Sequence, residues 1–88
     1  MAYFAQVDET NYVIEVIAVS NETIDFLPFP ESEPIGQEFI ASLGIQGTWL
    51  QTSYNANFRG VYAGIGYYFD ANLDEFIAPI IPDDSGNI

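Results

Sequence analysis

The stretch from residue 48 to residue 77, TWLQTSYNANFRGVYAGIGYYFDANLDEFI, places the strongest constraint on how this chain can fold. It holds more than half of the aromatic residues, the only Trp and the only basic side chain, Arg59. Residues 48–54 alternate, with Trp49 and Gln51 on one side, and include β-branched and aromatic types, which predicts a strand. The Asn and Gly residues that follow predict turns because both tolerate a positive φ at low cost.

Two pairs of apolar segments predict β-hairpins. Residues 3–7 and 12–19 flank the turn cluster DETN, and the second segment, YVIEVIAV, is the strongest strand pattern in the chain. Residues 65–69 and 75–78 flank a second turn, DANLD, at residues 70–74. Turn residues between two such runs are typical of antiparallel hairpins. We therefore expect two hairpins in addition to the strand at the Trp.

Residues 34–43 predict one short helix. Pro34 suits the first position of a helix, and Gly44 suits the position after its end. The apolar residues of this segment share one face at helical spacing: Ile35, Phe39, Ile40 and Leu43. The preceding residues, 21–33, are expected to form an irregular acidic loop, because Pro is excluded from central strands.

These elements together predict an α+β fold, in which a small antiparallel sheet of about five strands carries the helix on one face. We expect a single domain, residues 1–78, and an extended C-terminal arm, residues 79–88, that lies on a neighbouring copy. The side chains expected in the core come from the strands and the helix: Ile14, Val16, Phe39, Leu43 and Trp49.

The charge balance argues against two classes of partner. One Arg and no Lys stand against 13 Asp and Glu residues, which gives a net charge of −12 at pH 7. Nucleic-acid backbones and anionic membranes both attract Lys and Arg, so neither is an expected partner. The opening MAYFAQVDE lacks the basic and apolar regions of a signal peptide, and no apolar run is long enough to cross a membrane. We therefore expect a soluble protein that is made in the cytoplasm.

The side-chain inventory argues against catalysis. The chain has no Cys, no His and no Lys, so a nucleophile would lack the usual base. The paired carboxylates fall in turns or tails, where water screens them, and not in a pocket that would separate their pKa values. We expect a non-enzymatic protein that uses no cofactor.

The turn at residues 70–74 leaves a metal site open. Its first half matches a calcium loop, with oxygen ligands at Asp70, Asn72 and Asp74. The match then fails, because Glu75 and Ile81 stand where a calcium loop needs Gly and a bidentate Glu. A long hairpin turn explains the same residues, since Asp and Asn bond their own backbone in turns.

Most of the chain resembles a known group of proteins. Residues 48–55, TWLQTSYN, and residues 57–70, NFRGVYAGIGYYFD, are the most specific parts of the resemblance. With the opening MAYFAQVDETNYVIEVIAVSNE, they make residues 1–79 similar to small proteins encoded by tailed bacteriophages, notably marine and cyanobacterial ones. Gly60 follows Arg59 where those proteins usually have a basic residue. The resemblance implies a phage origin and a virion-associated role.

We accordingly expect a structural protein of the virion, assembled in the host cytoplasm, and most simply a capsid decoration or cement protein that forms a homo-oligomer or a lattice. Its partners would be phage capsid proteins or, alternatively, tail or tail-fibre proteins. The candidate partner contacts are aromatic, amide, basic and apolar residues: Tyr54, Asn57, Phe58, Arg59, Tyr62, Ile80 and Ile81. Arg59 could instead pair locally, since surface ion pairs are common and weak.

Two further functions remain open. An acidic protein can mimic DNA and block a host nucleic-acid-binding protein, but a mimic needs carboxylates along regular faces, whereas most of them lie in turns here. The Tyr and Asn residues of TSYNANF, residues 52–58, suggest a small carbohydrate- or receptor-binding module. Aromatic residues, however, more often belong to a core.

Overall fold

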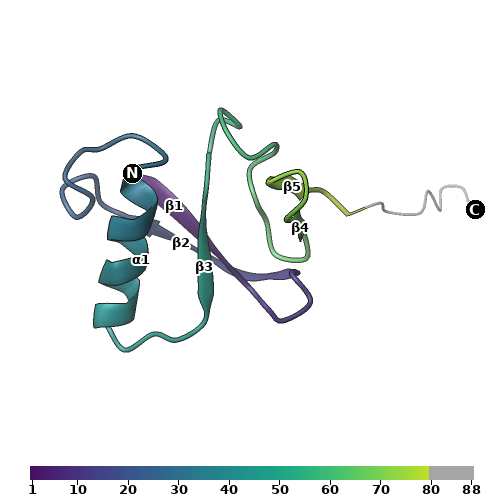
Figure 1. Ribbon diagram of the computed structural model, residues 1–88, viewed down its shortest axis with the longest axis horizontal. Helices are drawn as coiled ribbons and strands as arrows, with labels where there is room; N and C mark the ends of the chain where they lie inside the picture. The colour runs from purple at the N-terminus through teal and green to yellow at the C-terminus, as the bar shows by residue number, and fades with distance from the viewer. Residues whose placement is uncertain (80–88) are drawn as a thin grey trace, which may run out of the picture.

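The computed structural model describes residues 1–79, which form one helix and five strands (Figure 1). Their order is β1 (Ala2–Val7), β2 (Val13–Val19), α1 (Ser32–Ser42), β3 (Thr48–Thr52), β4 (Tyr68–Asp70) and β5 (Glu75–Ile77). The expected α+β fold is therefore confirmed, as are both hairpins and the strand at Trp49. Apart from its first residue, the expected C-terminal arm lies outside the described residues.

The strands form two antiparallel sheets, so the expectation of a single five-stranded sheet is wrong. β1 lies between β2 and β3 in the first sheet, and β4 pairs only with β5 in the second. Backbone hydrogen bonds link the second hairpin to the first sheet at one end of β2, where Val13 N donates to Tyr67 O and Gly66 N donates to Val13 O, both at 2.8 Å. These hydrogen bonds involve too few residues to add the second hairpin to the first sheet as a further strand.

The two sheets and the helix form three layers. Because β1 lies in the middle layer, alternate residues of it are buried on opposite faces. One core cluster joins the first sheet to α1: Ala2, Phe4, Val19, Ile24, Ile40 and Trp49. The other joins it to the second hairpin: Ala5, Val7, Val13, Ala63, Phe69 and Phe76. The expected core residue Trp49 is buried, while Phe39 and Val16 are half-buried beside these clusters.

A β-bulge in the first hairpin explains why Ile14 is 45% exposed, although we expected it in the core. Gln6 pairs with Glu15, and its neighbour Val7 pairs with Val13. Ile14 is therefore an extra residue on β2, and an extra residue breaks the alternation of sides on which the expectation depended.

The helix packs with most of the expected face: Ile40 is buried, and Ile35 and Phe39 are half-buried against the same core cluster. It ends at Ser42, so Leu43 lies in the turn beyond it and is 56% exposed, not buried as expected. The buried positions of α1 are spaced by four residues: Ser32, Gly36 and Ile40. Gly36 has no side chain, and the ring of Phe4 fills the space that a Cβ would occupy.

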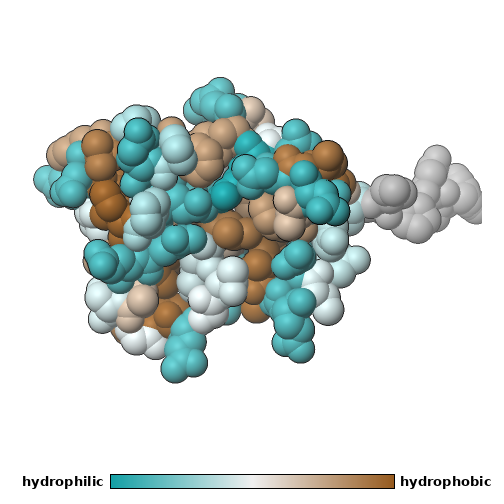
Figure 2. Space-filling model, in the orientation of Figure 1, coloured by the Kyte–Doolittle hydropathy of each residue, from teal (hydrophilic) through white to brown (hydrophobic). Residues whose placement is uncertain are grey.

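Apolar side chains also reach the surface. Figure 2 shows apolar groups interspersed among hydrophilic ones across one face of the molecule. The most exposed of the large apolar residues include Phe26, Ile65 and Leu73, which lie outside the strands and the helix. Single apolar residues exposed in separate loops are common on protein surfaces and do not by themselves define an interface.

Replacing Gly36 with Ala separates helix propensity from packing. Ala is favoured over Gly inside a helix by about 1 kcal/mol, so propensity alone predicts stabilisation. The added methyl group would overlap the fully buried ring of Phe4, and we therefore expect a loss of about 1–3 kcal/mol in the free energy of unfolding. Urea unfolding followed by Trp49 fluorescence measures this loss, with the exposed helix position Glu38→Ala as the control. An unchanged or higher stability would contradict the packing.

Candidate binding site

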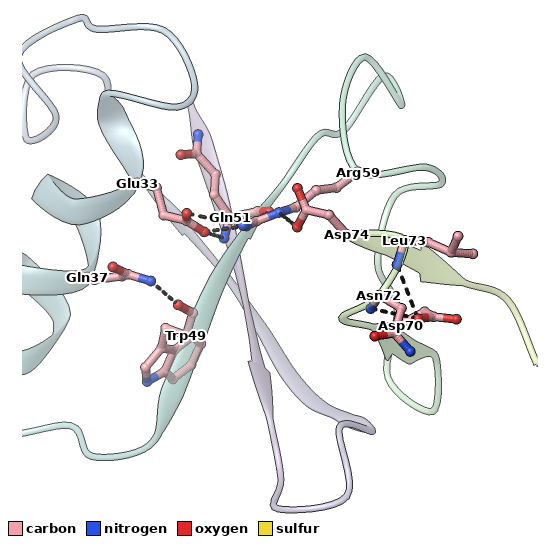
Figure 3. A network of polar contacts seen from close by, with 9 residues as sticks. All are labelled: Glu33, Gln37, Trp49, Gln51, Arg59, Asp70, Asn72, Leu73 and Asp74. Carbon is pink, nitrogen blue, oxygen red and sulfur yellow. Dashed lines mark hydrogen bonds and ion pairs between the residues drawn. The ribbon is translucent and has the colours of Figure 1, made fainter.

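Arg59 lies where the helix, β3 and the second hairpin meet (Figure 3). Its guanidinium pairs through Nη1 and Nη2 with the carboxylate of Glu33 in the first turn of α1. Nε donates to Asp74 Oδ1 at 2.9 Å, and Nη1 also donates to the carbonyl of Gln51 on β3 at 3.1 Å. The planar fork of Arg makes this set of bonds possible. We call these four residues the Arg59 clasp.

Further polar contacts join the same end of α1 to β3. Glu33 Oε2 accepts the backbone N–H of Gln51 at 2.9 Å, and the Ser32 hydroxyl donates to Gln51 Oε1 at 2.7 Å. One turn further along the helix, Gln37 Nε2 donates to the carbonyl of Trp49 at 2.6 Å (Figure 3). Because the Glu33 carboxylate lies in the first helical turn, it also interacts favourably with the helix dipole.

Aromatic rings surround the guanidinium of Arg59. Its Cζ lies 5.0 Å from the ring centroid of Phe29 and 5.6 Å from that of Phe69, distances at which the ring faces attract a cation. Phe29 in turn stacks on Phe58 with the centroids 3.9 Å apart. The Arg59 side chain is 11% exposed, so it pairs locally and offers little surface to a partner.

Three tyrosines form a cluster at the surface, near the end of β3, where Tyr3 of β1 pairs with Thr52. The rings of Tyr3 and Tyr54 stack with centroids 5.4 Å apart, and Tyr62 meets them edge-on at 5.6 and 5.1 Å. Beside the cluster is an open cleft of about 400 Å³, which we call the tyrosine cleft. Its lining is formed by Met1, Ala2, Tyr3, residues 51–55, Asn57 and Phe58.

The structure brings most of the predicted contact residues to this cleft. Tyr54, Asn57 and Phe58 line it, and Tyr62 packs on the ring of Tyr54. Arg59 belongs to the clasp instead, and the predicted contacts Ile80 and Ile81 lie outside the described residues. Sequence reasoning missed one main member of the site, Tyr3. Its place next to Tyr54 follows from the pairing of Tyr3 with Thr52, which no local pattern reveals.

The packing of the cluster raises the pKa of Tyr62. Desolvation by burial is the largest cause, and repulsion from the phenols of Tyr3 and Tyr54 adds to it. The Tyr62 phenol therefore keeps its proton, and with it the ability to donate a hydrogen bond, to a higher pH than an isolated tyrosine would.

The turn at residues 70–74 has the geometry of a hairpin turn that bonds itself. Asp70 Oδ1 accepts the backbone N–H groups of Asn72 at 2.9 Å and of Leu73 at 3.3 Å, while Asp74 is paired with Arg59 (Figure 3). Within residues 1–79, no group of three or more His, Cys, Asp or Glu side chains is placed to hold a metal ion. The geometry favours the hairpin-turn interpretation over the calcium loop.

Comparisons of the chain with protein-family models, with curated proteins and with solved structures return no match. The resemblance to phage proteins therefore stays a prediction, and the geometry of the site has to support any functional proposal. In the part of the chain that the structure describes, no helix is long and apolar enough to cross a membrane.

Removing the guanidinium should destabilise the whole fold. In Arg59→Met, the carboxylate of Glu33 would stay nearly buried without its charge partner, and we expect a loss of about 3–5 kcal/mol in the free energy of unfolding. Asp74 is 60% exposed, so Asp74→Asn should cost less than about 1 kcal/mol and serves as the control. Urea unfolding followed by Trp49 fluorescence measures both. Equal losses in the two variants would show that the Arg59–Glu33 ion pair contributes no more to stability than the exposed Arg59–Asp74 pair.

Alkaline titration tests the packing of the tyrosine cluster. A raised pKa means that the contribution of Tyr62 to stability is complete below the pKa of tyrosine in the unfolded chain, about 10, and is lost as the pH rises through the raised value. We expect Tyr62→Phe to remove a tyrosinate absorbance step that lies above the usual pKa of tyrosine, and to weaken the loss of stability at high pH. Tyr68→Phe, outside the cluster, is the control, and a late step that survives in Tyr62→Phe would refute the assignment.

Proposed function

We propose that this protein is a non-enzymatic structural protein of a tailed-bacteriophage virion, most simply a decoration protein on the capsid surface. The tyrosine cleft carries the proposal, because it is an open surface rich in aromatic rings and amides on a strongly acidic chain. Tyrosine is enriched where proteins meet partners, since it combines a large contact area with a polar end. The residues of the cleft offer contact groups and no evident nucleophile with its base.

The distribution of charge supports a place on a larger particle. Within residues 1–79, Arg59 pairs with Glu33 and Asp74, and the other acidic side chains of this range have no ion-pair partner. Like charges repel one another across separate copies. We therefore propose that copies dock individually onto a protein lattice, where binding to the assembled particle stabilises both partners by mass action.

Quantitative mass spectrometry of purified phage particles tests the proposal, because a virion protein copurifies in a fixed ratio to the major capsid protein. A decoration protein should be present at a copy number similar to that of the major capsid protein. A small fraction of that number would instead favour the alternative, a tail or tail-fibre protein.

The same preparation provides the outcome that would refute a virion role. The infected-cell lysate, depleted of particles, serves as the comparison sample. Finding the protein only there, bound to a host DNA-binding enzyme, would replace the proposal with the acidic DNA mimic.

A further inference from the structure

We infer that the tyrosine cleft binds a neutral saccharide, with a sugar ring lying on Tyr54. The inference rests on the proposed function only in taking the cleft as a binding surface, and it names the ligand that the cleft fits. A sugar ring has two kinds of surface, a face of C–H groups and an edge of hydroxyl groups. A site for it therefore needs a flat aromatic ring next to neutral donors and acceptors.

Tyr54 provides the flat ring. It is 62% exposed, yet its position is set by stacking on Tyr3 at an interplanar angle of 27° and by a T-shaped contact with Tyr62. A ring that is held in place before the ligand arrives loses little side-chain entropy on binding. Its negatively polarised face attracts the positively polarised hydrogens of C–H groups.

Amides and hydroxyls lie beside this ring. The side chains of Asn55 and Asn57 are exposed, each offers donors and an acceptor, and neither side-chain amide is hydrogen-bonded within residues 1–79. Ser53 Oγ accepts the backbone N–H of Asn57 at 2.9 Å, which holds the loop and leaves the hydroxyl proton of Ser53 free to donate. These groups can pair with several hydroxyls of one sugar.

The side chains that line the cleft are uncharged. Asp and Glu supply 13 of the 88 residues, yet no acidic or basic side chain is among the lining residues. The α-amino group of Met1 is the one charged group among the lining residues. A cationic ligand therefore finds no carboxylate here, and a multiply charged anion finds one ammonium group against the hydration that it loses. An uncharged, hydroxyl-rich ligand exchanges hydrogen bonds with water for hydrogen bonds with amides. The volume of about 400 Å³ lies in the lower part of the range for small-molecule sites and suits about one or two sugar rings.

The Arg59 clasp gives the cleft a rigid wall. Phe58 lines the cleft and stacks on Phe29, which lies against the guanidinium of the next residue, Arg59. The loop that carries Asn55 and Asn57 is thus held at β3 by the Ser53 hydroxyl and at its other end by the clasp. A loop anchored at both ends keeps its amides near fixed positions, which a shallow site for a neutral ligand requires.

Binding is tested with the full chain by NMR. ¹⁵N-labelled protein is titrated with glucose, galactose, N-acetylglucosamine and lactose, after a screen on an array of neutral oligosaccharides. We expect amide shifts confined to Tyr3 and residues 51–58, with a Kd on the order of 1 mM for a single sugar, equivalent to about 4 kcal/mol of binding free energy. No array signal and no shifts with any of these sugars would overturn the inference.

Three variants separate the contribution of the Tyr54 ring to binding from the general effects of replacing a surface tyrosine. Tyr54→Ala should weaken binding at least about tenfold, an expected loss for an exposed aromatic contact. Tyr54→Phe keeps the ring and should bind within about threefold of the parent, because the stacking face is unchanged. Tyr12→Ala changes an exposed tyrosine outside the cleft and should bind as the parent does. Unfolding midpoints establish that each variant is folded, and saccharide shifts that persist in Tyr54→Ala would overturn the inference.

The same variants distinguish this inference from the proposed function. If no saccharide binds and Tyr54→Ala lowers the copy number on purified particles, the cleft is a contact with the lattice, and only the saccharide inference fails. If saccharides bind but the protein is absent from purified particles, the saccharide inference stands and the virion proposal fails.

Discussion

Arg59 reaches from one loop to all three layers of the fold, and its pair with Glu33 is the contact whose loss would do most damage. Glu33 belongs to the helix, Gln51 to the first sheet and Asp74 to the second hairpin, and the single guanidinium bonds to each of them. Coulomb attraction at a site that is 11–15% exposed is screened less than at the surface. A chain with a net charge of −12 and one cation has no second residue that could replace this contact.

Local patterns were sufficient to predict the individual elements. The hairpins, the helix and the strand at Trp49 each have their signal within about ten residues, because alternation, turn residues and helix ends are local properties. The errors concern how elements meet. Ile14 is exposed because of a bulge that depends on the register between β1 and β2. The second hairpin is separate because its backbone hydrogen bonds to the first sheet are confined to one end of β2.

The site shows the same division between local and distant information. Tyr54, Asn57 and Phe58 are close in the sequence, so the segment TSYNANF identified them together. Tyr3 joins them only because β1 pairs with β3 across the chain. The local role of Arg59 was one of two interpretations, and nothing in its neighbouring residues could decide between them, since Glu33 is 26 residues away.

The clasp and the cleft divide two physical tasks between adjacent residues. Phe58 and Arg59 are neighbours in the chain, yet Phe58 lines a cleft without acidic or basic side chains, while Arg59 carries the only basic side chain inward. This arrangement removes the cation from the binding surface and uses it to stabilise the loop behind it. The cleft should keep its affinity for an uncharged ligand when salt is added, since screening acts on pairs of charges. The net charge of −12 would meanwhile keep separate copies apart at low ionic strength. The strength of ligand binding and the tendency of copies to associate should therefore respond differently to salt.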